Sequence, residues 1–260
     1  MKNLIISVIV EILKLRRSNI LLVTVILFAF IPTMMGLLML LSQHPELAEK
    51  MGLVGAKANF FSTNNWQGFF AMMNQMIAAI GIIGFGFVIS WVFGREHMEH
   101  TLTSIIALPV KRSTMVLAKF IVSLFWCTLL IITMYFTGIV IGKLVNMQGW
   151  SLTGFATFNR IFFATAYLAF LVSTPVAFIA GWTKGIIAPI GFVILTMILA
   201  QIIAAVGLGP VFPWAIPGIY TVPVKSPGYV LTSASYVIVL LTFLFGLIGT
   251  VAWWNRADHN

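Results

Sequence analysis

Long apolar stretches, each of about 20 residues or more, alternate with shorter polar stretches along the chain. A hydrocarbon core of about 30 Å is crossed by about 20 helical residues, because each residue adds roughly 1.5 Å. The pattern therefore predicts an all-α membrane protein with six transmembrane helices. The predicted spans are residues 19–41, 68–93, 114–141, 161–180, 185–206 and 231–254. The linkers between them are residues 42–67, 94–113, 142–160, 181–184 and 207–230.

Residues 1–17 show a different pattern, with polar side chains at helical spacing on one face and apolar side chains on the other. The polar positions are Asn3, Ser7, Glu11, Lys14 and Ser18, and the apolar positions are Leu4, Ile5, Val8, Ile9, Ile12, Leu13 and Leu15. This pattern predicts an amphipathic helix that lies in the cytoplasmic membrane interface. A signal peptide is the alternative, but Glu11 and Lys14 interrupt the apolar stretch and no small-residue cleavage pattern follows.

The composition agrees with a chain whose main solvent is lipid. Of its 260 residues, 60% are hydrophobic and 8% are charged, and the mean hydropathy is +1.06. Soluble domains carry about 25% charged residues, so we expect residues 1–260 to form one transmembrane domain. The net charge of +9 comes from bases scattered between the spans, a distribution typical of contact with anionic lipid and not of nucleic-acid binding.

The positions of Lys and Arg predict the orientation, because cytoplasmic loops are enriched in these residues. We expect a multi-pass protein of the cell membrane with both termini in the cytoplasm. The bases then in the cytoplasm are Lys2, Lys14, Arg16, Arg17, Arg95, Lys111, Arg112, Lys119, Lys184 and Arg256. The bases outside are Lys50, Lys57, Lys143, Arg160 and Lys225.

Residues 207–230 are dense in Gly and Pro, with apolar residues between them. Such a broken stretch before the last span predicts a re-entrant segment of short helices in the outer leaflet, where irregular backbone must be shielded by protein or line a wet cavity. An ordinary interfacial loop anchored by aromatic residues is the alternative.

Polar side chains are few within the predicted spans, and none of them is Asp or Glu. Coupled transporters and pumps usually hold an ionisable residue inside the membrane, so this absence disfavours proton- or sodium-driven transport. Hydrogen bonding between helices is the simpler interpretation of the uncharged polar residues. The alternative is that Asn74, Gln75 and Gln201 line a translocation path.

Motifs for chemistry are missing. No phosphate-binding loop and no His-Glu-x-x-His motif occurs, and the tract 97–100 lacks a fourth metal ligand. The single cysteine, Cys127, excludes an intrachain disulfide. We therefore expect no catalytic residue, no cofactor site and no metal site in this chain.

The linker 94–113 begins with charges, continues with an apolar stripe and reaches Pro109. Its apolar residues can form one side of a short helix parallel to the membrane, which requires a partner for that side. This segment resembles the cytoplasmic coupling region of type-two ABC export permeases, the ABC-2 family, in which a Glu precedes Thr-Leu and then Pro and Arg. The matching positions are Glu96, Thr101, Leu102, Pro109 and Arg112.

The flanking strings Phe-Gly-Arg-Glu and Ala-Leu-Pro-Val-Lys-Arg are most similar to the bacitracin and lantibiotic self-resistance permeases. His100 and Met98 depart from the family pattern, where a Gly and a second acid are frequent. The resemblance implies a coupling helix between spans two and three that contacts a separate ATPase subunit. The coupling residues it implies are Arg95, Glu96, Glu99, Thr101, Leu102, Ile105, Ile106, Pro109 and Arg112. Ordinary charged residues at a helix end are the alternative interpretation of Arg95 and Glu96.

The resemblance further implies a permease subunit that works as a dimer, with a second copy or a paralogous permease. ATP and Mg would bind to the partner ATPase, and the substrate would be hydrophobic or amphipathic, such as a peptide antibiotic. Two other functions stay open: an ATP-independent channel or carrier, and a membrane sensor or assembly subunit that moves no substrate.

Overall fold

The computed structural model describes residues 2–43, 65–99, 101, 110–222 and 229–256. Helices account for all the regular secondary structure of these residues, apart from one isolated bridge between Asn65 and Gln148. The long helices are α1 (Lys2–Arg16), α2 (Ile20–Gln43), α4 (Trp66–Met98), α6 (Arg112–Leu144), α7 (Leu152–Ser173), α8 (Pro175–Trp182), α9 (Ile187–Ala205) and α11 (Ser233–Arg256). Three short helices precede α11, namely η2 (Gly209–Val211), η3 (Pro213–Ala215) and α10 (Ile216–Tyr220).

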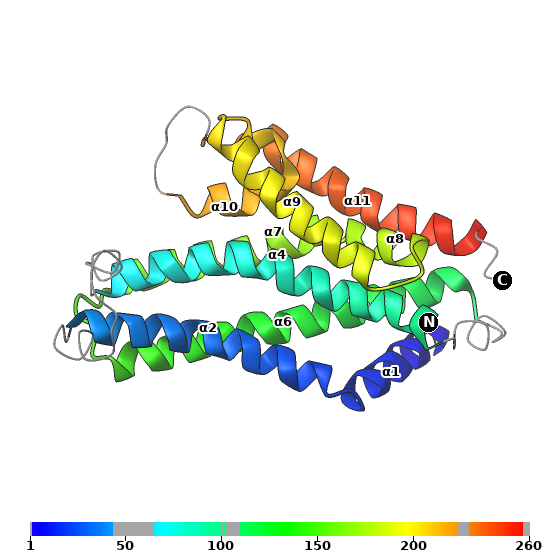
Figure 1. The fold of residues 1–260 in the computed structure, drawn as a ribbon, viewed down its shortest axis with the longest axis horizontal. Helices are drawn as coiled ribbons and strands as arrows, with labels where there is room; N and C mark the ends of the chain where they lie inside the picture. The colour runs from blue at the N-terminus through cyan, green and yellow to red at the C-terminus, as the bar shows by residue number, and fades with distance from the viewer. Residues whose placement is uncertain (1, 44–64, 100, 102–109, 223–228, 257–260) are drawn as a thin grey trace.

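The part of the chain that the structure describes contains 6 helical stretches long and apolar enough to cross a membrane, in agreement with the predicted number of spans. They are Ile20–Leu41, Trp66–Met98, Arg112–Leu144, Leu152–Trp182, Ile187–Ala205 and Ser233–Arg256. Figure 1 shows α1 and the last turn of α11 at the same end of the bundle. We call this end, where α4 finishes at Met98 and α6 begins at Arg112, the terminal end. The opposite end, with the first turn of α4 and helix α10, is the distal end.

Helices α4 and α6 are longer than predicted, with 33 residues each. At about 1.5 Å per residue each measures roughly 50 Å, which exceeds the hydrocarbon thickness of about 30 Å. At the terminal end, α4 continues beyond the predicted limit at residue 93 and includes Arg95 and Glu96. The predicted linker 94–113 is therefore helical in its first part.

The fourth span is divided into α7 and α8 at Thr174, whereas the sequence predicted one continuous span. Pro175 has no N–H to donate to the carbonyl of Leu171, which ends α7. The Thr174 hydroxyl donates a hydrogen bond to that carbonyl at 2.8 Å and partly replaces the missing bond. Helices α7 and α8 together still form one candidate span, Leu152–Trp182, because α8 continues the apolar stretch.

Helix α4 lies at the centre of the bundle and packs against α7, α6, α9 and α8. Its buried residues include Phe69, Met73, Ile77, Phe85 and Ile89. At the distal end, aromatic rings from α4 and α7 stack, with Phe70 and Phe158 at a centroid distance of 4.3 Å. Helix α4 therefore extends from the distal end to the terminal end through the middle of the bundle.

Helix α1 packs against α6 with its polar face toward the bundle. The side chain of Glu11 is only 14% exposed, and Leu15 is buried. The opposite face exposes apolar residues, namely Ile5, Ile6, Ile9, Val10, Ile12 and Leu13. Residues 2–16 form the predicted helix, in which Glu11 and Lys14 face protein whereas Arg16 is exposed. Its depth in the membrane interface stays a prediction.

The segment after α9 folds back toward the bundle, and α10 packs against α7 and α4 (Figure 1). Ile216 and Ile219 are buried in these contacts. The sequence predicted short helices here, and η2, η3 and α10 are such helices. Whether they enter the outer leaflet stays a prediction.

Candidate functional site

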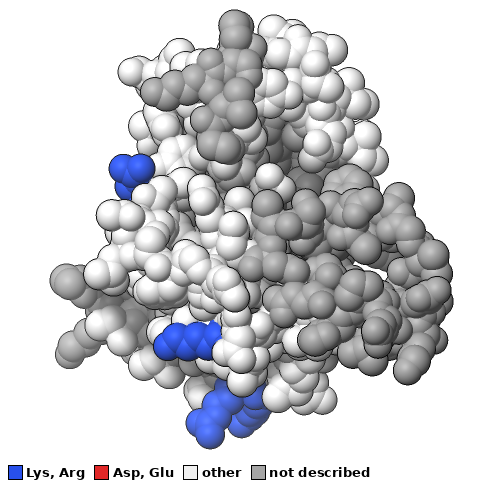
Figure 2. Space-filling view, turned by 90° about the vertical axis from the view of Figure 1, so that its left-hand side faces the viewer, with Lys and Arg blue, Asp and Glu red and all other residues white. Residues whose placement is uncertain are grey.

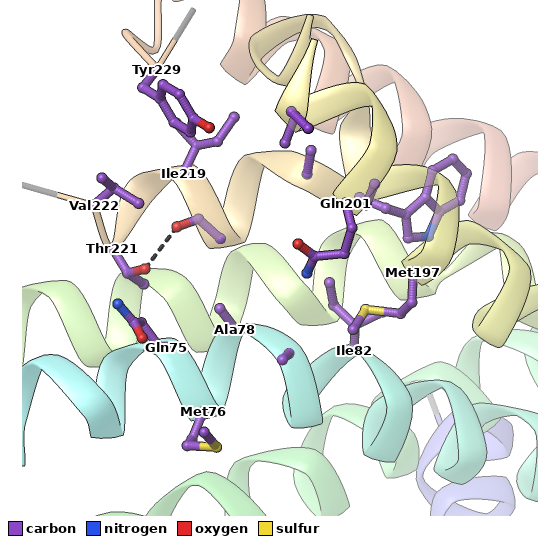
Figure 3. Close-up of a pocket in the computed structure, with 17 residues that line it drawn as sticks. Gln75, Met76, Ala78, Ile82, Met197, Gln201, Ile219, Thr221, Val222 and Tyr229 are labelled. Atoms are coloured by element: carbon purple, nitrogen blue, oxygen red, sulfur yellow. Dashed lines mark hydrogen bonds between the residues drawn. The ribbon is translucent and has the colours of Figure 1, made fainter. Parts of the chain in front are cut away.

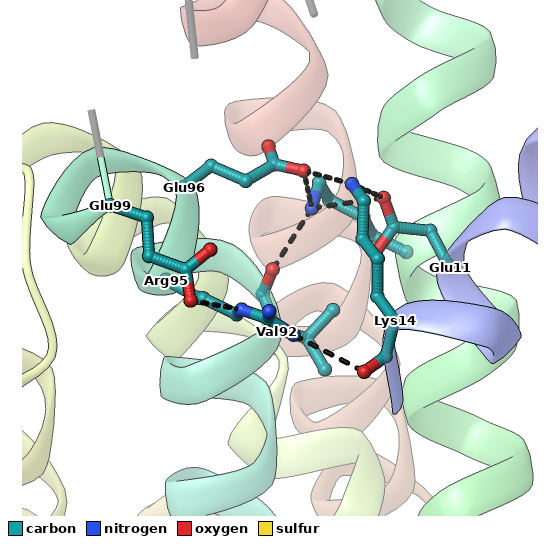
Figure 4. Close-up of polar contacts among 7 residues, drawn as sticks. Glu11, Lys14, Val92, Arg95, Glu96 and Glu99 are labelled. Carbon is teal, nitrogen blue, oxygen red and sulfur yellow. Dashed lines mark hydrogen bonds and ion pairs between the residues drawn. The ribbon is translucent and has the colours of Figure 1, made fainter. Parts of the chain in front are cut away.

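Four charged side chains meet at the terminal end, and we call them the ion cluster: Glu11 and Lys14 of α1, Glu96 of α4 and Lys119 of α6. Figure 4 shows the network of contacts. Lys14 Nζ lies 2.8 Å from Glu11 Oε1 and 2.7 Å from Glu96 Oε1. Lys119 Nζ lies 3.0 Å from Glu96 Oε1 and 3.4 Å from Glu11 Oε1. Each acid therefore contacts both bases.

The centre of the ion cluster is buried. The side chains of Lys119 and Glu96 are 2% and 3% exposed, and Lys119 Nζ also donates to the carbonyl of Val92 at 3.0 Å. Charges removed from water are tolerated only when they are paired and hydrogen-bonded. Two acids and two bases balance here, so the cluster holds three helices together without a net buried charge.

Lys14 lies outside the membrane-spanning helices, at the solvent side of the ion cluster. Burial lowers the pKa of its ammonium group. The opposite charges of Glu96 and Glu11, with hydrogen bonds to both carboxylates, outweigh burial and raise this pKa above its ordinary value. Lys14 therefore remains a cation throughout the physiological range.

Further contacts extend the ion cluster to neighbouring groups. Arg95 Nε pairs with Glu99 Oε1 at 2.6 Å, and Arg95 Nη1 donates to the carbonyl of Lys14 at 3.3 Å. The Arg95 guanidinium also lies 4.8 Å from the centroid of the Trp91 ring. Arg112 Nη1 donates to the carbonyl of Trp254 at 3.1 Å, which joins the start of α6 to the end of α11.

Gly94, which precedes Arg95 in the predicted motif, lies where α4 meets the turn between α8 and α9. A Cβ atom at Gly94 would lie 2.6 Å from the carbonyl oxygen of Gly185 and 2.9 Å from its carbon. Both are backbone atoms, which cannot move aside as a flexible side chain can. Glycine at this position allows the end of α4 to approach the turn closely.

The structure separates the predicted coupling residues that it describes into two groups. Glu96 is buried within the chain, and Arg95 and Arg112 are partly buried in intrachain contacts. Glu99 and Thr101 are exposed where α4 ends. Leu102, Ile105, Ile106 and Pro109 lie outside the described residues, so their contact with a partner stays a prediction.

Sequence reasoning missed the partners of Glu96. The statement that no acid lies in the spans holds for residues 68–93 but is wrong for the observed α4, whose last turns contain Glu96. Glu11 and Lys14 were visible as a pair at helical spacing, and Lys119 as a base inside an apolar stretch. A base in such a stretch signals that an acid must lie nearby in space.

A pocket of about 470 Å³ opens between α4, α9 and α10 toward the distal end (Figure 3). Its lining residues are Gln75, Met76, Ala78, Ala79, Ile82, Met197, Ala200, Gln201, Ala204, Ala205, Trp214, Ala215, Gly218, Ile219, Thr221, Val222 and Tyr229. We call it the distal pocket. None of these lining residues is charged.

Two of the three predicted path residues, Gln75 and Gln201, line the distal pocket from α4 and α9. Asn74 is buried, 5% exposed, and is not among the lining residues. The two glutamines are 126 positions apart along the chain by their numbers, 201 minus 75, so only the fold brings them together.

The terminal ion cluster and the distal pocket are two polar regions of one helical bundle. The model of the ABC-2 family transporter proteins matches residues 7–203. The chain belongs to the ABC-2 transporter family. Permeases of this family work with an ATPase partner, so this chain is a transport subunit rather than an enzyme. The match includes the ion cluster, Gln75 and Gln201, whereas α10 and α11 lie beyond it.

The ABC-2 chain is also similar to the bacitracin transport permease protein BCRB of Bacillus licheniformis. The two are 25% identical over 184 residues, which cover 70% of this chain and 88% of the relative. No solved structure matches the chain. Within the described ranges, no three His, Cys, Asp or Glu side chains are grouped so that they could hold a metal ion.

Proposed function

We propose that this ABC-2 permease is the membrane subunit of an ATP-driven exporter that removes an amphipathic substrate, such as a peptide antibiotic, from the bilayer. The observation that carries the proposal is the family match over residues 7–203, together with similarity to a permease named for bacitracin transport. The alternatives of an ATP-independent channel or carrier, and of a sensor, have no observation that favours them over this function.

The terminal end supports a role in coupling. The ion cluster joins α1, α4 and α6 directly beside the segment that connects Met98 to Arg112. A movement imposed on that segment by a partner ATPase would therefore move three helices together. ATP and Mg would bind to the ATPase, and the exposed Glu99 and Thr101 are the described side chains that it would reach first.

The charge distribution supports a cytoplasmic location for the terminal end. Described bases near this end include Lys14, Arg95, Lys111, Arg112 and Lys184. Figure 2 looks at the distal end and shows only scattered Lys and Arg, with no acidic side chain of the described residues in view. Under the positive-inside rule both termini are cytoplasmic and the distal pocket lies in the outer half of the membrane.

The test is reconstitution of the full chain with its ATPase in inverted vesicles, with bacitracin and ATP supplied outside the vesicles. The expected result is accumulation of the peptide that requires ATP and stops when the ATPase is omitted. A matched pair of variants addresses docking: Leu102→Asp is expected to release the ATPase, and Leu152→Asp, at an exposed residue at the distal end, is expected to retain it.

Two outcomes would contradict the exporter, and a third would contradict the proposed coupling surface. Flux without ATP would identify a channel or carrier, and a change in ATPase signalling without movement of any peptide would identify a sensor. An ATPase that remains bound to Leu102→Asp as tightly as to the unchanged chain would place the coupling surface elsewhere. A second permease copy is expected in the same complex, measured by its mass in nanodiscs.

A further inference from the structure

The distal pocket contains polar groups that the rest of the chain leaves without partners. Gln75 and Gln201 are exposed, and neither amide forms a hydrogen bond with a described residue. Trp214 also lines the pocket, and its buried Nε1 has no acceptor in the part of the chain that the structure describes. A buried donor without a partner costs free energy, and the two exposed amides are available for hydrogen bonds, so this pocket is suited to a molecule that bonds to all three groups.

The hydrogen-bonding groups of the pocket define the chemistry of the molecule that would bind there. Each glutamine offers an NH₂ donor and a carbonyl acceptor, and the indole of Trp214 offers one more donor. Figure 3 shows Gln75 on α4 and Gln201 on α9 extending into the space below α10. A ligand that bonds to both glutamine amides and to the Trp214 indole must carry several neutral donors and acceptors. The amide groups of a peptide backbone have this chemistry.

The remainder of the wall favours the same ligand. Small side chains leave the volume of about 470 Å³ open. The small residues are Ala78, Ala79, Ala200, Ala204, Ala205, Ala215 and Gly218. The described lining residues carry no charge, so an ionised phosphate that entered would lose water without gaining a cation.

We propose that the distal pocket binds uncharged amide groups of a peptide substrate, with Gln75 and Gln201 as its hydrogen-bonding residues. This inference rests on the proposed function, since it takes a peptide as the exported substrate, and it names the part of the peptide that is recognised. The apolar side chains of the peptide would remain in the surrounding lipid.

The test compares two amphiphiles with the same tail, dodecanoyl-glycyl-glycinamide and dodecyl phosphate. The full chain, co-purified with its ATPase, is placed in phosphatidylcholine nanodiscs without ATP. Ala205→Cys introduces a thiol on the pocket wall, and the natural Cys127 is fully buried. The measured quantity is the rate at which a methanethiosulfonate reagent modifies the introduced thiol. The diamide is expected to slow this rate, and the phosphate is expected to leave it unchanged.

Variants in the Ala205→Cys background then identify the recognising groups. Loss of one neutral hydrogen bond weakens binding by about three- to tenfold. Gln75→Leu and Gln201→Leu are each expected to raise the diamide concentration for half-maximal protection by that factor. Met76→Leu, an apolar change on the same wall, is the matched control and is expected to change nothing.

Several results would overturn the inference. These are protection by the phosphate equal to that by the diamide, protection by neither probe, and protection that persists unchanged when both glutamines are replaced. Dissociation of the permease pair in the glutamine variants would show that the amides pair with a second copy instead. Because binding is measured without ATP, absence of ATP-driven transport would contradict the proposed function and leave the binding result intact.

Discussion

The ion cluster and the distal pocket are two polar regions in a chain that is 60% hydrophobic. Their polar side chains differ in whether they have partners within the chain. In the ion cluster, charged side chains from three helices are buried and paired at distances of 2.7–3.4 Å. In the distal pocket, the side chains are uncharged, and Gln75 and Gln201 have no partner among the described residues.

The paired charges of the ion cluster stabilise the fold, whereas the unpaired amides of the distal pocket are available to bind a ligand. Paired buried charges are costly to disturb, because removing one leaves the other without compensation. Unpaired amides contribute little to folding, since no hydrogen bond within the described part of the chain is lost with them. We therefore expect substitutions in the ion cluster to lower the free energy of unfolding strongly. Substitutions of the glutamines in the distal pocket should affect only the binding and transport of substrate.

The largest expected effect comes from breaking the centre of the ion cluster. Lys119→Met leaves Glu96 with one base instead of two, and Glu96→Gln leaves two lysines with one acid. Loss of one partner from a buried pair costs about 3–5 kcal/mol, so each variant should lower the free energy of unfolding by about 3 kcal/mol, measured by SDS titration in mixed micelles.

The double variant Glu96→Gln with Lys119→Met tests whether the two residues act as a pair. It retains one acid and one base, so its loss should be clearly smaller than the sum of the two single losses. Glu99→Gln is the control, because Glu99 is 47% exposed and exposed pairs contribute about 0–1 kcal/mol. Additive losses would show that the cluster is not a coupled unit.

A smaller but substantial effect is expected where α4 approaches the turn at Gly185. Gly94→Ala places a methyl group within 2.6 Å of a backbone oxygen, and such overpacking costs about 1–3 kcal/mol. The thermal midpoint in detergent should fall accordingly. Gly191→Ala, where a Cβ atom would meet nothing within 4 Å, should leave the midpoint unchanged or raise it. An equal fall in both variants would indicate a general response to glycine replacement.

The edge of the ion cluster should respond more weakly and more locally. The side chain of Lys14 is 28% exposed, so Lys14→Met should cost only about 1 kcal/mol. The loss should appear as faster hydrogen exchange in α1, because Lys14 joins that helix to α4. Lys119 still neutralises Glu96 in this variant. Uniformly faster exchange across α4 and α6 would mean that Lys14 supports the whole bundle rather than α1.

The smallest stability effect is expected in the distal pocket. Gln75→Leu and Gln201→Leu should change the free energy of unfolding by less than about 0.5 kcal/mol, as surface substitutions usually do. The same variants should reduce ATP-dependent peptide accumulation about three- to tenfold, the effect of one neutral hydrogen bond. A loss of stability comparable to that of Lys119→Met would show that these glutamines stabilise the bundle. The two regions would then not differ in their contribution to folding.

The sequence predicted the features that depend on local pattern. The number of spans followed from apolar stretches, and the helix of residues 1–17 followed from its 3.6-residue periodicity, because both signals are contained in consecutive residues. The family resemblance of the linker 94–113 was also local, and the ABC-2 match confirmed the family.

Only the tertiary structure decided which polar residues meet. Lys14 and Glu96 are 82 positions apart, and no periodicity connects them. The inward direction of the charged face of α1, the helical extension of α4 through Glu96 and the union of Gln75 with Gln201 in one pocket all depend on packing between distant helices. The physical reason is that hydrophobicity is a property of each segment alone, whereas the cost of a buried charge or amide depends on the neighbour that the fold places beside it.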